Sequence, residues 1–113
     1  MRIKKNFEEY KEKMDTYKAD MEIYINGICK SPIAMVIKIC DRIDNLRNIA
    51  DKDSADLVEK YILESIWISN ILQKIKEKKF LDNVIIEELE KDFIEALRYA
   101  ESVKRDKEKQ NGQ

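Results

Sequence analysis

Histidine is absent from this chain of 113 residues, and only 2 glycines and 1 proline occur. Without imidazole, neither a Ser/His/Asp nor a Cys/His catalytic arrangement can form. Two glycines in total leave no Gly-rich phosphate-binding loop. Turn residues are scarce while Lys, Glu, Ile and Leu dominate, a balance that disfavours many short strands. The composition therefore predicts an all-α protein.

A strong charge of either sign is also missing. The chain has 22 Lys and Arg against 23 Asp and Glu, so its formal net charge is only −1. No overall field directs the protein toward nucleic acid or an anionic membrane surface. We therefore expect neither binding in a DNA groove nor a membrane partner.

Long hydrophobic runs and a cysteine framework are lacking as well. No apolar run reaches the roughly 18 residues of a membrane span, and the charged N-terminus does not resemble a signal peptide. Cys29 and Cys40 are isolated thiols among apolar residues. This pattern predicts a cytoplasmic protein in which both cysteines are buried and reduced.

The first predicted helix runs from Ile3 to Ile28 with apolar residues spaced alternately four and three positions apart. Such a seam can pack against another chain or against later helices of the same chain. The strict 3.5-residue period favours a helix partner, and hence a homo-oligomer. The predicted interface residues are Phe7, Tyr10, Met14, Tyr17, Met21 and Tyr24.

Three further helices are predicted by apolar periodicity and capping residues, over Pro32–Ala50, Ala55–Lys78 and Asn83–Lys107. The first of these is apolar on almost every side at its start, so we expect it to be the central and most buried helix. Together the elements predict a four-helix array in one domain, 1–109, followed by a disordered tail, 110–113.

One segment carries a motif: the sequence SPIAMVIKICDRIDNLR, from Ser31 to Arg47. Its polar and apolar positions resemble the closing motif of HD-domain phosphohydrolases, especially the RelA/SpoT-type guanosine tetraphosphate hydrolases and their small relatives. The matching residues are Lys38, Asp41, Arg42, Asn45, Leu46 and Arg47. A preceding Tyr-Ile pair, the Ser31-Pro32 step and a following Lys-Tyr pair repeat the order of that family's flanks, so the resemblance covers about residues 20 to 75.

The resemblance implies a partial HD-like bundle in which Asp41 occupies the position of the last metal-ligating aspartate and Asn45 faces a nucleotide. Positions four apart lie side by side on a helix. The candidate ligand-binding residues are Lys38, Asp41, Arg42, Asp44, Asn45 and Arg47. The family also needs a first His and a His-Asp pair, and both are missing here. We therefore expect no metal cofactor and no catalysis.

Three functions remain open on this basis. The first is a non-catalytic binding protein, an inhibitor or sequestering protein that recognises a protein or a nucleotide. Its small size and Lys/Ile/Glu bias suit a phage protein directed at a bacterial defence component. The second is one half of a split hydrolase, completed by a chain that supplies the histidines. The third is a structural or adaptor bundle, in which Asp41 pairs with Lys38 or Arg42 and Asn45 bonds to backbone.

Overall fold

The computed structural model describes residues 22–52 and 54–112, and these residues are helical apart from short connections. A helical segment, Glu22–Ile28, precedes α2 (Pro32–Arg47), the 3-10 turn η1 (Ile49–Asp51), α3 (Ala55–Lys78) and α4 (Asn83–Gly112). The described residues contain no strand. The all-α fold class is therefore confirmed, and the expected helix over residues 3–21 lies outside the described residues.

Two serines fix the starts of α2 and α3. The Ser31 hydroxyl accepts a hydrogen bond from the Ala34 amide at 3.3 Å, with Pro32 in the first turn. The Ser54 hydroxyl accepts one from the Leu57 amide at 3.2 Å. Each bond satisfies an amide that has no partner within its own helix. Helix α3 has the bounds that the sequence predicts.

The predicted ends of α2 and α4 are wrong. Helix α2 stops at Arg47, three residues early. Asn48 closes it, because both its backbone amide, at 3.1 Å, and its side chain, at 2.9 Å, donate to the Asp44 carbonyl. Helix α4 continues to Gly112, through residues that we expected to be disordered. Its last turns are rich in Lys, Glu and Gln, whose intrinsic helix propensity is high and does not depend on packing against a core.

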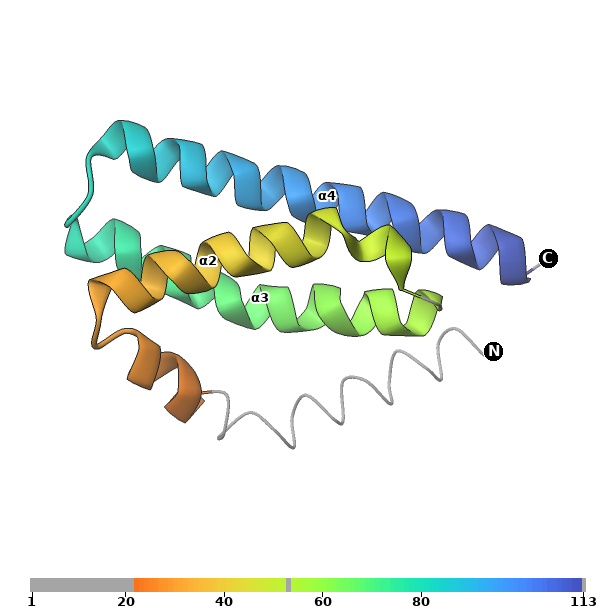
Figure 1. The fold of residues 1–113 in the computed structure, drawn as a ribbon, viewed down its shortest axis with the longest axis horizontal. Coiled ribbons are helices and arrows are strands. Elements are labelled where there is room, and N and C mark those ends of the chain that lie inside the picture. The colour runs from red at the N-terminus through yellow and green to blue at the C-terminus, as the bar shows by residue number, and fades with distance from the viewer. Residues whose placement is uncertain (1–21, 53, 113) are drawn as a thin grey trace.

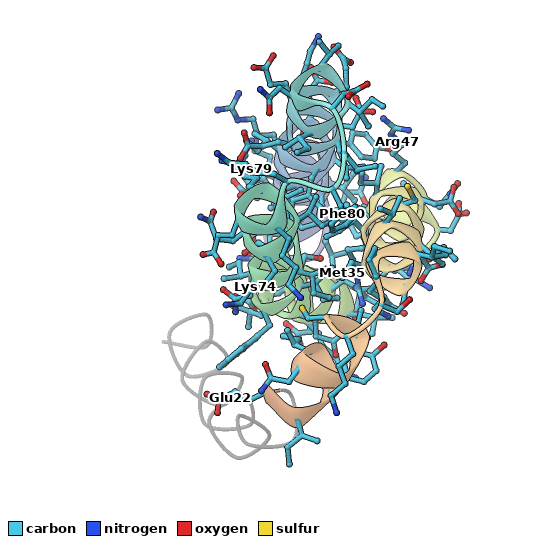
Figure 2. All side chains as sticks on the ribbon, turned by 90° about the vertical axis from the view of Figure 1, so that its left-hand side faces the viewer. Glu22, Met35, Arg47, Lys74, Lys79 and Phe80 are labelled. Carbon is cyan, nitrogen blue, oxygen red and sulfur yellow. The ribbon has the colours of Figure 1, made fainter. Side chains whose placement is uncertain are left out.

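The core lies where α2, α3 and α4 meet, with α3 running antiparallel to the other two (Figure 1). Viewed from the end of the bundle, the three helices stand at the corners of a triangle, with Met35 and Phe80 between them (Figure 2). Each helix buries one broad stripe and contributes large side chains to a single cluster. Its fully buried members include Met35, Ile39, Leu46, Ile68, Ile71, Ile75 and Phe93.

Helix α2 is apolar on almost every side at its start, and we expected it to be the central and most buried helix, but two of its large apolar side chains face outward. Ile33 is 73% exposed and Ile37 is 62% exposed, and both lie on the outer face of the helix. Cys40, which we expected to be buried, is also exposed, whereas Cys29 is buried as predicted. The reason is geometric: within residues 22–52 and 54–112, α3 and α4 cover only one side of α2, so an apolar residue on the other side has neither of these helices against it.

Within the described residues, no single helix is both long and apolar enough to cross a membrane. The Glu22–Ile28 segment and α2 pass that test only as a pair bent by 120°. The α2 half of this pair supplies Met35, Ile39 and Leu46 to the core.

A matched pair of substitutions on α3 tests this packing. Ile68 is 2% exposed and Ile66 is 55% exposed, two residues away. We expect Ile68→Ala to lower the free energy of unfolding by about 2–5 kcal/mol, because it leaves a cavity in the core. Ile66→Ala should change it by less than about 0.5 kcal/mol. Urea denaturation measures both, and equal losses would contradict the orientation of α3.

Candidate functional site

The motif residues on α2 point in three directions. Lys38, Asp41 and Asn45 fall within about 60° of one another around the helix axis, given about 100° per residue. Arg42 points toward α3, and Arg47 points toward α4. The predicted ligand set is therefore not brought together as one cluster, because the side chains of consecutive helical residues diverge.

Lys38, Asp41 and Asn45 form what we call the polar flank of α2. Asp41 is exposed, while Lys38 and Asn45 are partly buried. The Lys38 ammonium lies 5.3 Å from the centre of the Tyr24 ring, a cation–π contact that joins the flank to the Glu22–Ile28 segment. Asp41 makes no hydrogen bond or ion pair within residues 22–52 and 54–112. Its carboxylate is thus available to a partner from outside.

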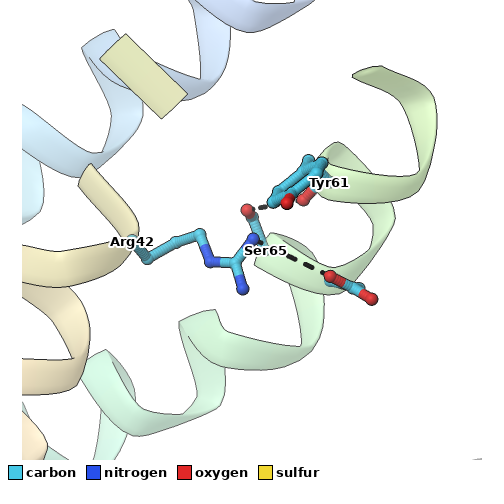
Figure 3. Close-up of polar contacts among 4 residues, drawn as sticks. Arg42, Tyr61 and Ser65 are labelled. Carbon is cyan, nitrogen blue, oxygen red and sulfur yellow. Dashed lines mark hydrogen bonds and ion pairs between the residues drawn. The ribbon is translucent and has the colours of Figure 1, made fainter. Parts of the chain in front are cut away.

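Arg42 is the one charged residue buried among the described residues, with 7% of its surface exposed. It extends from α2 toward Ser65 and Tyr61 of α3 (Figure 3). Its Nη1 lies 3.8 Å from the Glu64 carboxylate, which is an ion pair but too long for a hydrogen bond. Arg42 Nε and Nη1 are buried and have no hydrogen-bond partner. The proposed pairing of Asp41 with Lys38 or Arg42 is therefore wrong.

Tyr61 is the centre of a group that the motif did not identify. Its ring lies 5.4 Å from the Arg42 guanidinium carbon and 5.0 Å from the Lys52 ammonium. The Tyr61 backbone carbonyl accepts a 2.7 Å hydrogen bond from the fully buried Ser65 hydroxyl. The helical spacing of Tyr61, Glu64 and Ser65 places them on neighbouring positions of α3, but sequence alone does not show which α2 residue faces them.

Asp44 and Arg47 have local roles in the structure. The Asp44 carboxylate accepts a long hydrogen bond of 3.4 Å from the Asn48 side chain. The Asp44 carbonyl accepts a second bond from the same side chain at the C-terminal end of the helix. Arg47, more than half exposed, lies 3.8 Å from the Asp92 carboxylate of α4. Exposed ion pairs of this kind contribute less than about 1 kcal/mol.

The predicted oligomer interface lies mostly outside the described residues. Phe7, Tyr10, Met14, Tyr17 and Met21 belong to that part of the chain. Of the six, only Tyr24 is described, and it is 46% exposed with Lys38 against its ring. The interface therefore stays a prediction.

The described residues contain no group of three or more Cys, Asp or Glu side chains that could hold a metal ion. The sequence itself excludes histidine ligands. No protein-family model, curated protein or solved structure matches the chain. The resemblance to HD-domain hydrolases therefore rests on the residues of α2 and its flanks alone.

The energetics of Arg42 can be tested against those of its counterion. We expect Glu64→Gln to lower the free energy of unfolding by about 1–3 kcal/mol, because it leaves a buried cation without a countercharge. Arg42→Met should change it by less than about 1 kcal/mol, since the apolar side chain fills the same space and Glu64 keeps access to water.

Urea denaturation of both variants and of the double variant closes a thermodynamic cycle. If Arg42→Met lowered the free energy of unfolding more than Glu64→Gln does, the guanidinium would have to make stronger polar contacts than its distances to Glu64 and Tyr61 indicate.

Proposed function

We propose that this protein is a non-catalytic, HD-like binding protein of the cytoplasm that inhibits or sequesters a protein partner through the polar flank of α2. The observation that carries the proposal is the position of Asp41. Its carboxylate is exposed and has no partner within the described residues. An aspartate that serves hydrolysis needs further ligands to hold the catalytic ion beside it.

The composition of the flank supports recognition. Lys38, Asp41 and Asn45 offer a cation, an anion and an amide within about two turns of one helix. Such a set can pair with opposite charges and with backbone groups of a partner, which gives specificity and fast association. The exposed Ile37 adjoins Asp41 on the same helix and adds the apolar contact that protein interfaces need at their centre.

A protein partner suits this surface better than a nucleotide does. Small ligands are held in concave sites that bury most of their surface. The flank lies instead on the outer side of a helix, where Asp41 and Ile37 are both exposed. A surface of this form is complementary to another macromolecule, so inhibition would act by covering the partner rather than by consuming a substrate.

The same observation supports a second candidate, one half of a split hydrolase. An exposed, unpaired Asp41 is open to metal ligands from another chain. That chain would have to supply the first His and the His-Asp pair that this sequence lacks. The two candidates agree on the surface and differ in whether the complex hydrolyses a substrate.

We expect the protein, immobilised and exposed to a lysate of its natural host, to retain one specific polypeptide. The double variant Asp41→Ala/Asn45→Ala should lose that polypeptide, because both polar contacts disappear. Glu87→Ala, at an exposed position of α4, is the matched control and should retain it. Mass spectrometry identifies the retained protein, and native mass spectrometry reports any bound nucleotide.

Thermal unfolding of the wild type, the double variant and Glu87→Ala separates an effect on binding from an effect on folding. Equal capture by the double variant and the wild type, or a loss of stability without a loss of binding, would contradict the proposal and favour an adaptor bundle. Hydrolysis of guanosine tetraphosphate with Mn²⁺, lost in Asp41→Ala, would show an enzyme. Activity of the protein alone would exclude a non-catalytic role, and activity only with the captured polypeptide would establish the split hydrolase.

A further inference from the structure

Arg42 carries buried N–H groups that no residue of the described chain satisfies. Its Nε and Nη1 are buried without a hydrogen-bond partner, and only 7% of the residue is exposed. Buried polar groups in proteins almost always have a partner, which is a protein group, a water molecule or an ion. A buried cation without such a partner is especially costly. The guanidinium therefore offers strong donors to an acceptor from outside the chain.

The planar guanidinium has two donor edges, and Glu64 lies at only one of them. Nη1 points toward the Glu64 carboxylate at a distance of 3.8 Å. The other terminal nitrogen points away from Tyr61 and Ser65 (Figure 3). Together with Nε it forms the second edge, whose two parallel N–H groups are the arrangement that binds two oxygens of a carboxylate or a phosphate group. This second edge of Arg42 is available to a ligand.

Lys38 supplies a second positive charge one turn before Arg42. Residues four apart lie on the same face of a helix, and their side chains lean toward the helix N-terminus, so Arg42 leans toward the turn that carries Lys38. Lys38 is partly buried and makes no ion pair with a carboxylate of residues 22–52 and 54–112. Two like charges at this spacing repel each other, and an anion between them would remove that repulsion.

The surrounding charges also favour an anion. Lys52 is a third cation of this group, with its ammonium 5.0 Å from the centre of the Tyr61 ring. The neighbouring carboxylates are Glu64, which already faces Arg42, and Asp41, which is exposed. Asp41 is also about 100° from Arg42 around the helix axis, so it does not reach the second edge of the guanidinium. The group therefore keeps an excess of positive charge.

We infer that Arg42 and Lys38 bind a small oxyanion of the phosphate class at the contact between α2 and α3. The second edge of Arg42 donates to two of its oxygens, and the Lys38 ammonium pairs with a third. The burial limits the size of the ligand: the side chains of Arg42 and Glu64 are 8% and 30% exposed, so a small ion reaches the guanidinium where a bulky ligand does not. The inference goes beyond the proposed function and does not depend on it, although both use Lys38.

NMR spectroscopy of the Arg42 Nε–H group tests the site directly on the full chain. Arg42→Met assigns the resonance, because only this signal disappears. Inorganic phosphate should shift the resonance saturably, whereas chloride at the same ionic strength should not. Lys38→Gln should raise the dissociation constant at least about tenfold, because it removes one of the two charges that hold the anion. Lys91→Gln, at an exposed position of α4, is the matched control and should leave the dissociation constant unchanged.

Thermal unfolding gives a second readout. Phosphate should raise the melting temperature of the wild type more than chloride does, because it binds only the folded chain. The increase should be larger for Glu64→Gln, since the internal carboxylate no longer repels the anion. Phosphate also stabilises proteins in general, and the response of Arg42→Met measures that general effect.

Three results would overturn the inference. A Nε–H resonance that phosphate does not move would show that water satisfies the guanidinium. An equal response of Arg42→Met and the wild type to phosphate would place any binding elsewhere. Tighter binding of adenosine monophosphate than of inorganic phosphate would contradict a site for small ions. The proposed function is tested separately, by capture from a lysate, so either hypothesis can fail while the other stands.

Discussion

The rotation of α2 about its own axis is the constraint on which the functional surfaces depend. Met35, Ile39, Ile43 and Leu46 are all buried against α3 and α4, and together they fix which side of the helix faces inward. Releasing any of these side chains to water would cost about 1.5–3 kcal/mol, so the helix cannot turn by a third of a revolution. This rotation sets the direction in which every other side chain of α2 points, whatever the chemistry of that side chain.

That rotation separates residues that the motif groups together. Asp41 and Arg42 are adjacent in sequence, yet Asp41 is exposed and Arg42 is buried beside Tyr61. Lys38 and Asn45 remain on the same side as Asp41, whereas Arg47 turns toward Asp92 of α4. The motif therefore does not act as one ligand set. Its buried member, Arg42, belongs to packing, and Asp41 with its neighbours on the polar flank is the part that we propose for recognition.

The sequence predicted the fold class and several boundaries because those depend on local signals. Ser54 caps α3, and an unbroken apolar period carries that helix to Lys78. The outer face of α2 was not predictable in the same way. Ile33, Ile37 and Cys40 are as apolar as the residues that are buried, and hydrophobicity alone does not tell which of several apolar faces meets a neighbour. Only the positions of α3 and α4 settle that question.

The candidate site was predictable in its composition but not in its contacts, for the same reason. The motif identified Lys38, Asp41 and Asn45, and helical geometry placed them on one face. It could not show that Arg42 meets Tyr61 and Glu64, because these residues lie about twenty positions later on another helix. Contacts between helices depend on crossing angle and rotation, which no local pattern encodes.

Arg42 shows why a buried charge is informative even where it adds little stability. Burying a guanidinium with two unsatisfied N–H groups is unfavourable, and an apolar residue of similar length would remove that cost. The Arg42 guanidinium makes a cation–π contact of about 0.5–2 kcal/mol with the Tyr61 ring and an ion pair with Glu64, and these two contacts offset part of the cost. These contacts are directional, whereas the contacts of isoleucines are not. Arg42 therefore acts on specificity more than on stability, because other rotations of α2 against α3 would bury the same charge without Glu64 or Tyr61 beside it. Together with the buried apolar side chains of α2, Arg42 favours the rotation that leaves the polar flank turned toward solvent.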